Sequence, residues 1–318
     1  MNFLVCFNGK KDKPKLFTVN LQAKFENAVM KIVFAILFLI LGATAYAQED
    51  AEGGRGIASG WDFGLNFGFY IPPAYHAGFY DGSEENVNKM SYVFGNKYYR
   101  DEISRSLNSS DTFFITGMPQ NMHYTGAFTI GLYFRRTFDK YFGFSMQFNY
   151  SKLHANDLFQ IEVDPNTILT EPDLRTFPIW GVEERVNIDL NFSKYFHTKS
   201  KISLPFVEAG FNINSSTVKE NMIQINDLKY SLVDVYLNGS GYVPNLSQTT
   251  YTVHQGGIGW GINAGGGLRL IFNEAVSVDP GVTFYYQKVA LENYEKFKPG
   301  VVIYVRLSLS GFFAAASE

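Results

Sequence analysis

The sequence predicts an all-β protein: an eight-stranded antiparallel up-and-down transmembrane β-barrel with long external loops. First, apolar and polar residues alternate with a period of two over runs of about ten residues or more, the length that a tilted strand needs to cross a bilayer. Second, aromatic residues make up 17% of the chain, yet the mean hydropathy is -0.08. In a membrane barrel the alternation cancels in such an average. Third, short turns and long connections alternate along the chain.

The N-terminal region differs from the rest of the chain. Residue Met30 opens the run MKIVFAILFLILGATAYAQ, in which Lys31 precedes an apolar core and an Ala-Tyr-Ala cleavage signature ends at Ala47. This order predicts a secretory signal peptide, with an N-terminal membrane anchor helix as the alternative. Residues 1–29 lack a clear period and are predicted to be an upstream extension, and 30–47 are the predicted signal peptide. A periplasmic N-terminal segment is predicted at 48–60, an outer-membrane β-barrel at 61–313 and a tail at 314–318.

The first predicted strand covers 61–71 and ends at Pro72-Pro73, because proline cannot donate to a central ladder. The segment 123–155 shows the alternation most clearly and predicts a hairpin around Asp139-Lys140. The remaining strands are expected at roughly 176–193, 204–214, 256–272, 275–288 and 300–313.

Three connections between the strands are long. Residues 72–122 show no sustained period and are predicted as a long external loop, and 155–175 is predicted as a second polar loop. Residues 215–254 form the third, although 221–237 alternates and is expected to extend a hairpin beyond the membrane. An even number of strands with the short turns on one side places both barrel termini in the periplasm.

Charge indicates which face of each strand points inward. The apolar face is nearly free of charge, whereas the polar face carries residues of both signs that can pair in a narrow lumen. A soluble barrel with an apolar interior is the alternative, but it leaves the long loops and the aromatic residues unexplained. The predicted lumenal charge network is Asp62, Arg135, Glu183, Arg185, Asp189, Glu208, Arg269, Asp279 and Arg306.

Aromatic residues at the strand ends predict two girdles at the membrane interfaces. Two charged residues have the lipid-facing parity: Glu184, expected at the upper interface or at a bulge, and Arg136, expected to reach the headgroups. The predicted interface aromatics are Trp61, Phe138, Tyr141, Phe192, Phe272 and Phe313 at the periplasmic rim, and Trp180, Trp260 and Tyr286 at the external rim.

Four segments carry a family resemblance: the leader at Met30, GWDFGLNFGFY, GWGINAGGGLRLIF and VVIYVRLSLSGFF. Together they resemble the PorT-like small barrels of the OmpA-type superfamily from Bacteroidota-type bacteria. The resemblance implies a location in the bacterial outer membrane, with lipid as a partner, and insertion by the barrel-assembly machinery. Some PorT-like members serve protein secretion. The family favours a C-terminal aromatic residue, whereas five residues follow Phe313 here.

No motif in the sequence indicates a catalytic, cofactor-binding or metal site, and the net charge of -3 gives no reason to expect nucleic acid. The glycines of 256–267 lack the strand–turn–helix context of a nucleotide site. We therefore expect a non-enzymatic barrel with a side-chain-filled lumen, acting through loops 72–122 and 215–254 as a binding, structural or secretion-accessory protein for an unknown partner. The alternative is a narrow pore lined by Glu183, Arg185, Glu208 and Arg306.

Overall fold

The computed structural model describes residues 60–109, 113–139, 141–163, 173–198, 202–233, 255–272 and 275–310. The predicted upstream extension, signal peptide and tail, and residue Phe313, lie outside this part of the chain. Among the described residues, no helix has both the length and the apolar character needed to cross a bilayer.

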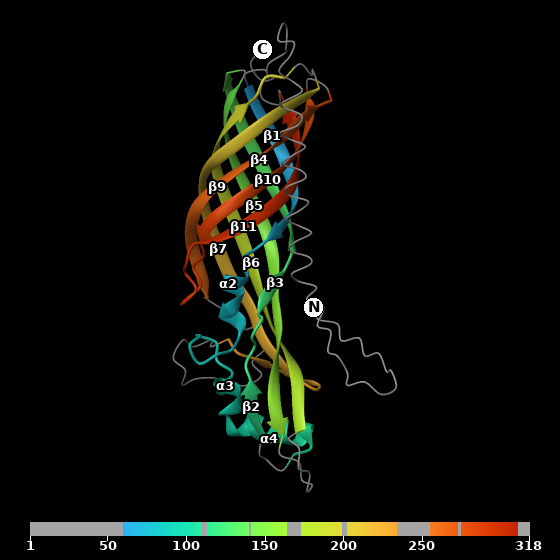
Figure 1. Cartoon of the computed structure of the whole chain (residues 1–318), viewed down its shortest axis with the longest axis vertical. Helices are drawn as coiled ribbons and strands as arrows, with labels where there is room; N and C mark the ends of the chain where they lie inside the picture. Colours follow the sequence, from blue (N-terminus) through green and yellow to red (C-terminus); the bar gives the residue numbers. More distant parts are fainter. Residues whose placement is uncertain are drawn as a thin grey trace, which may run out of the picture.

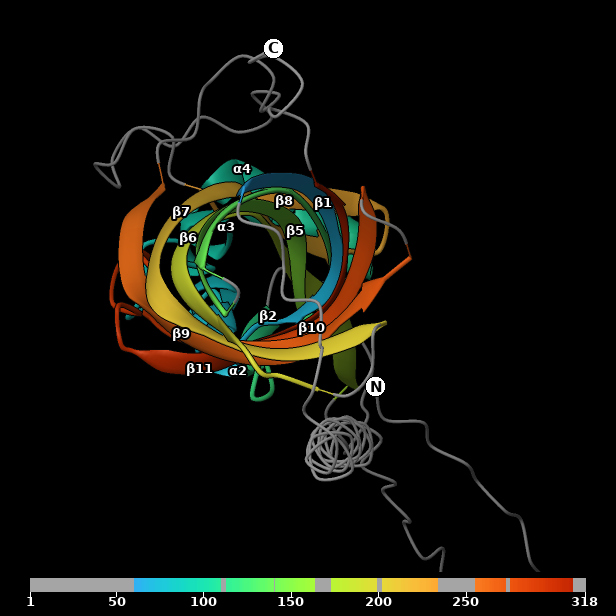
Figure 2. The ribbon, with the colours of Figure 1, turned by 90° about the horizontal axis from the view of Figure 1, so that it is seen from above.

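Eight antiparallel strands pair into a closed ring, in the order β5-β4-β1-β11-β10-β9-β7-β6 and back to β5. Figure 1 shows these strands tilted around a common axis, and Figure 2 shows the ring from above. The predicted eight-stranded up-and-down barrel is confirmed. The strands are β1 (Gly60–Ile71), β4 (Ala127–Asp139), β5 (Phe142–Val163), β6 (Asp173–Tyr195), β7 (Ser203–Ile225), β9 (Gly256–Ile271), β10 (Val276–Lys288) and β11 (Lys298–Ser310).

Side chains alternate strictly between the two faces of the barrel wall. On β5, Ser145 and Gln147 point into the lumen and are buried, whereas Phe144 and Met146 lie on the outer face. On β1, Leu65 and Phe67 are exposed on the outer face. An outer face of leucine, phenylalanine, isoleucine and valine is stable only in contact with lipid, so the barrel is a transmembrane barrel.

Strands β5, β6 and β7 are much longer than the others, with 22, 23 and 23 residues, and their polarity reverses partway along. Beyond Ser151 the inward residues of β5 become apolar, beginning with Leu153, while Lys152 and His154 on the outer face are exposed. This is the pattern of a sheet with water on its outer face and a core behind it. We call this level the polarity boundary; it lies between Ser151 and Leu153 on β5, Glu183 and Gly181 on β6, and Ser216 and Val218 on β7.

Short elements cover the inner face of the long strands beyond the polarity boundary. We call this whole region the capped end and the opposite end of the barrel, with the tight turns, the turn end (Figure 1). The covering elements are α2 (Ala74–Ala77), η1 (Gly78–Tyr80), α3 (Ser91–Phe94) and α4 (Lys97–Leu107). Three short strands extend the sheet beside the long ones: β2 (Phe113–Gly117) and β3 (His123–Thr125) pair with β5, and β8 (Leu228–Ser231) pairs with β7.

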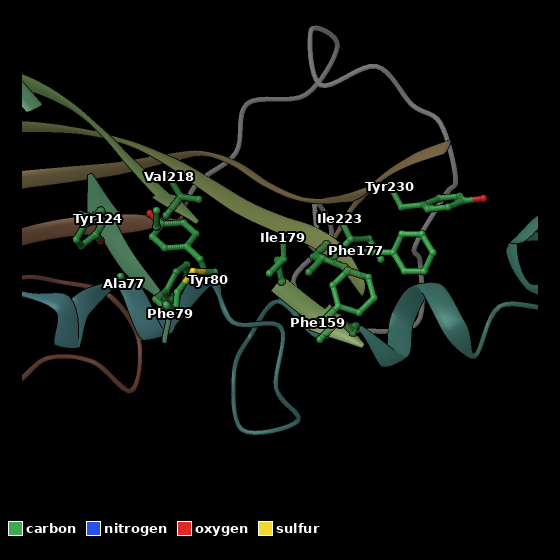
Figure 3. Packing of buried hydrophobic residues seen from close by; sticks show 14 of the residues in the cluster. Ala77, Phe79, Tyr80, Tyr124, Phe159, Phe177, Ile179, Val218, Ile223 and Tyr230 are labelled. Atoms are coloured by element: carbon green, nitrogen blue, oxygen red, sulfur yellow. The ribbon is translucent and has the colours of Figure 1, made fainter. Parts of the chain in front are cut away.

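The capped end has its own hydrophobic core. Figure 3 shows Phe159, Phe177, Ile179 and Ile223 of the long strands packed together, with Tyr230 beside them. Asn96 caps the N-terminus of α4, where its side chain accepts a hydrogen bond from the Tyr98 backbone N–H, and Asn108 in the left-handed conformation caps the C-terminus. Burying each large apolar side chain contributes about 1.5–3 kcal/mol, so this core stabilises the cap without help from lipid.

Two predictions about the connections are wrong, and a third is confirmed in part. Residues 72–122 are largely folded rather than a featureless loop. The sequence shows no sustained period there because three of the four helical segments, α2, η1 and α3, have only 4, 3 and 4 residues. The predicted loop 155–175 is mostly strand, since β5 runs to Val163 and β6 starts at Asp173. In 215–254, β7 continues to Ile225 and pairs with β8, as the alternation of 221–237 indicated.

Glu184 lies at the polarity boundary, on the outer face of β6. Its carboxylate is 3.1 Å from the Lys219 Nζ. The β6–β7 register shifts between Val182 and Glu183, and Lys219 lies between the paired residues Val218 and Glu220. Glu184 therefore has both features that were predicted as alternatives, a position at the edge of the apolar band and a bulge beside it. Together they allow its carboxylate to pair with a lysine rather than contact lipid.

Candidate functional site: the lumen and its capped mouth

All nine charged residues predicted to face the lumen are buried there, with exposed fractions of 5% or less. They form three groups along the barrel axis. One group lies at the turn end, one at the centre, and one where the lumen meets the capped end, which we call the capped mouth. Buried charges are stable only when they are paired and hydrogen-bonded, so the contacts within each group determine whether the lumen is closed.

At the turn end, Arg135 is the centre of the network. Its guanidinium donates to the Asp62 carboxylate and to the Tyr195 hydroxyl, and lies 3.6 Å from a carboxylate oxygen of Asp279. Arg269 approaches the same Asp62 oxygen at 3.1 Å. Two arginines and two carboxylates thus neutralise one another across strands β1, β4, β9 and β10.

At the centre, Arg306 lies across the lumen. Its guanidinium donates to Asn66 Oδ1 at 3.1 Å and to Glu208 Oε1 at 3.3 Å, and its Cζ lies 3.7 Å from the centre of the Tyr133 ring. The Tyr304 hydroxyl also donates to Glu208, at 3.1 Å. The planar guanidinium is held by a carboxylate on one edge and an aromatic ring on its face, which leaves it little freedom.

Asp189 has no arginine partner and is surrounded by neutral donors. The Tyr285 hydroxyl donates to Oδ2 at 2.8 Å, and the Asn212 side-chain amide donates to Oδ1 at 2.7 Å. Asn263 and Asn149 donate at 3.1 and 3.3 Å. Amide and phenol groups from four different strands therefore fill the lumen beside this carboxylate.

At the capped mouth, Glu183 and Arg185 form an ion pair with an N–O distance of 2.7 Å. Tyr124 from β3 and Tyr80 from η1 donate their hydroxyls to Glu183 at 2.7 and 3.2 Å. Arg185 donates to the Tyr70 hydroxyl at 3.0 Å. Figure 3 shows Tyr80 and Tyr124 converging at this end of the core. The cap is thus hydrogen-bonded directly to the lumenal network.

Close packing at the mouth requires a glycine. A Cβ added at Gly181 would lie 2.1 Å from Cδ1 of Tyr80. Burial, followed by the nearby Glu183 charge, raises the pKa values of both Tyr80 and Tyr124 well above the usual value, so both hydroxyls remain donors. The mouth is therefore filled by side chains.

His76 on α2 is also buried in the cap. Its Nε2 lies 3.2 Å from the Lys296 carbonyl oxygen. Burial, followed by the positive charge of Arg185, lowers the pKa of His76 to about 4. Near neutral pH the ring is uncharged, and it acts as a packing residue. Among the described residues, no group of three or more His, Cys, Asp and Glu side chains could hold a metal ion.

The predicted turn-end aromatics lie on the outer face. Trp61, Phe138, Phe192 and Phe272 are 45–70% exposed in the isolated chain. Arg136 lies over the Trp61 and Phe138 rings, at 5.2 and 5.9 Å from their centres. The predicted outward position of Arg136 therefore places its charge on interface aromatics.

The aromatics toward the capped end differ in part from the prediction. Trp260 and Tyr286 are half-exposed on the outer face, and Phe297, which the prediction missed, packs between them. Trp180 does not belong to this girdle, because it lies beyond the polarity boundary, with its Nε1 3.4 Å from Glu220. Tyr141 lies near the turn end, where its hydroxyl is 3.4 Å from Nδ1 of His197.

The sequence reasoning missed the uncharged partners of the lumenal charges. Seven buried asparagines line the lumen, and three of them, Asn149, Asn212 and Asn263, donate to Asp189. Their inward parity was visible in the sequence, but no local pattern indicates which of them meet across the barrel. The asparagines are Asn66, Asn149, Asn187, Asn191, Asn212, Asn214 and Asn263.

Comparison with solved structures gives small barrels at low similarity. Neisserial surface protein A is 8% identical, with 81% of this chain and 99% of that chain covered and a TM-score of 0.36. The outer membrane protein OprG from Pseudomonas aeruginosa is 8% identical, with 81% and 95% covered and a TM-score of 0.34. The N-terminal β-barrel domain of OprF from the same species is 9% identical, with 80% and 99% covered and a TM-score of 0.33. No protein-family model and no curated protein matches the sequence.

Proposed function

We propose that this transmembrane barrel resides in the bacterial outer membrane, keeps its lumen closed and presents the capped end outside the cell as a rigid binding platform. In this proposal both barrel termini are periplasmic and insertion uses the barrel-assembly machinery. The PorT-like resemblance supports the same class of function, and a secretion-accessory role is one form that this function could take. The protein contacts its partner through the regions 72–122 and 215–254 without catalysis.

The observation that carries the proposal is the capped end itself. A barrel needs only a turn to connect two strands, yet here three strands continue past the lipid band and enclose a core with four short helical segments. Exposed apolar side chains on this region, including Tyr98, Phe114 and Leu158, are 56–80% exposed. Such residues in a water-facing structure are typical of contact surfaces for other macromolecules.

The closed lumen separates this proposal from the narrow pore. An eight-stranded barrel leaves room for side chains rather than for a channel, and here arginine, carboxylate, tyrosine and asparagine side chains contact one another across it. The pore remains the second candidate, because its predicted lining residues Glu183, Arg185, Glu208 and Arg306 all face the lumen.

Conductance in planar lipid bilayers distinguishes the two functions. We expect no steady single-channel current from the purified protein, because the Glu183–Arg185 mouth group and the central Arg306 group block the axis. A useful matched variant is Tyr80→Ala, which removes one mouth contact while the barrel still shows a heat-modifiable gel shift. Steady current in the unmodified protein, with an ion selectivity that changes in Glu208→Gln, would establish the pore instead.

A further inference from the structure

The sheet of the capped end has an open edge at β2. Beyond the polarity boundary the three long strands continue with β2 on one side, which pairs only with β5, and β8 on the other, which pairs only with β7 (Figure 1). Among the described elements, none other than β5 runs alongside β2, whereas α2 lies beside the neighbouring strand β3. An edge strand presents a row of unpaired backbone N–H and C=O groups to which another extended chain can hydrogen-bond.

The two edges of this sheet differ in their protection. Strand β8 carries Lys229, an exposed residue whose Nζ lies 5.9 Å from the centre of the Trp180 ring. A lysine on an edge strand hinders the pairing of further strands. Strand β2 reads Phe-Phe-Ile-Thr-Gly, without charge or proline. Its pairing with β5 is regular from Phe113 to Ile115 and shifts register only before Gly117. Phe113–Ile115 therefore form a regular stretch of edge that no charge or proline blocks.

The outer face beside this edge is apolar. Phe114 is 60% exposed and pairs with Glu162 of β5, which in turn pairs with Leu174 of β6, itself 53% exposed. Phe113 points the other way and is buried, with the Arg100 guanidinium 4.8 Å from its ring centre, so β2 is anchored to the cap. A strand added to β2 would place one of its side chains directly beside the Phe114 ring.

We propose that β2 binds an extended segment of a partner polypeptide, which joins the capped-end sheet as a further strand. Donors and acceptors that alternate at the spacing of a strand are complementary to another polypeptide backbone. The exposed Phe114 ring favours an apolar side chain at the neighbouring position of the added strand. The inference rests on the proposed function, in which the capped end binds a partner, and it specifies the chemistry of that partner.

The test uses the full mature protein in detergent and a pool of short peptides in which Val, Ile or Phe alternates with Thr. Amide hydrogen exchange followed by mass spectrometry reports where the peptides bind. We expect millimolar peptide to slow exchange in the segment 113–117 roughly tenfold and to leave 228–231 unchanged, because a new strand covers the open amides of β2. The same pool methylated at every backbone nitrogen is expected to give no protection, since it has no N–H donors.

Phe114→Lys is expected to weaken the peptide affinity roughly fivefold, which corresponds to the loss of one aromatic cross-strand pair. Tyr98→Lys is the matched control and should leave the affinity unchanged, because Tyr98 is an exposed aromatic residue on α4 rather than on the edge. The peptide concentration that gives half of the protection measures both.

Three results would overturn the open-edge site: no protection of 113–117 at millimolar peptide, equal protection by the methylated pool, or equal affinity in Phe114→Lys. A dimer of the unmodified protein that Phe114→Lys dissociates would also overturn it, in favour of a second copy of this chain at the edge. Failure of the closed-lumen function appears separately, as conductance.

Discussion

Arg306→Ala is expected to lower the free energy of unfolding by about 3–5 kcal/mol, because it leaves a buried carboxylate without its cation. Glu208 would keep only neutral donors, among them Tyr304 at 3.1 Å and Gln147 at 3.5 Å. The Tyr133 ring would also lose the guanidinium that lies 3.7 Å from its centre. Equilibrium unfolding in urea, with the protein in lipid vesicles, measures the change.

The double variant Arg306→Met with Glu208→Met is the control for this expectation. It removes both charges and keeps similar volume, so most of the lost stability should return. A single Arg306→Ala variant as stable as the unmodified protein would show that water reaches Glu208 freely, and the side-chain-filled lumen would then be wrong.

Met146→Arg is expected to lower the free energy of unfolding in a bilayer by about 2–4 kcal/mol, because it places a charge at mid-membrane depth on the lipid face. Met146 lies on the outer face of β5, paired with Phe134 and Leu190. Gln160→Arg is the matched change: it has the same strand and the same face, but lies beyond the polarity boundary and is exposed. Its effect should stay within about 0.5 kcal/mol.

Urea unfolding in vesicles and the heat-modifiable gel shift compare the two arginine variants directly. Equal losses of stability in Met146→Arg and Gln160→Arg would mean that both positions contact the same environment. The change from lipid to water along β5 would then be absent.

The sequence predicted the barrel well because its signal is local. Alternation along each strand determines which side chains face inward, so the ring of eight strands and the buried positions of Arg135, Glu208 and Arg306 followed from parity alone. The polarity reversal on β5 is also visible in the sequence, where the inward positions become apolar at Leu153. No turn residue marks this point, which comes at the end of the predicted hairpin. A change of face polarity in the middle of a strand looks the same in a sequence as the end of a strand.

The contacts across the lumen could not be predicted, because they join residues far apart in the chain. Tyr80 and Glu183, for example, meet only after the cap folds onto the ring. The fold of the 72–122 region was not predicted for a different physical reason: of its four helical segments only α4, with 11 residues, is long enough to show a helical period, whereas α2, η1 and α3 have 4, 3 and 4 residues. Its apolar residues, such as Phe79 and Ile103, form a core whose partners are on other strands.

Cysteine labelling in intact cells tests the central claim most directly. In a protein carrying Cys6→Ser, a membrane-impermeant maleimide should react with Gln160→Cys on intact cells and should not react with Met146→Cys. Lys194→Cys, exposed at the turn end of β6, should react only after the outer membrane is permeabilised. The expected order is the capped end outside the cell, the lipid band in the middle and the turn end in the periplasm. Labelling of Met146→Cys in intact cells, or of Gln160→Cys only after permeabilisation, would contradict it.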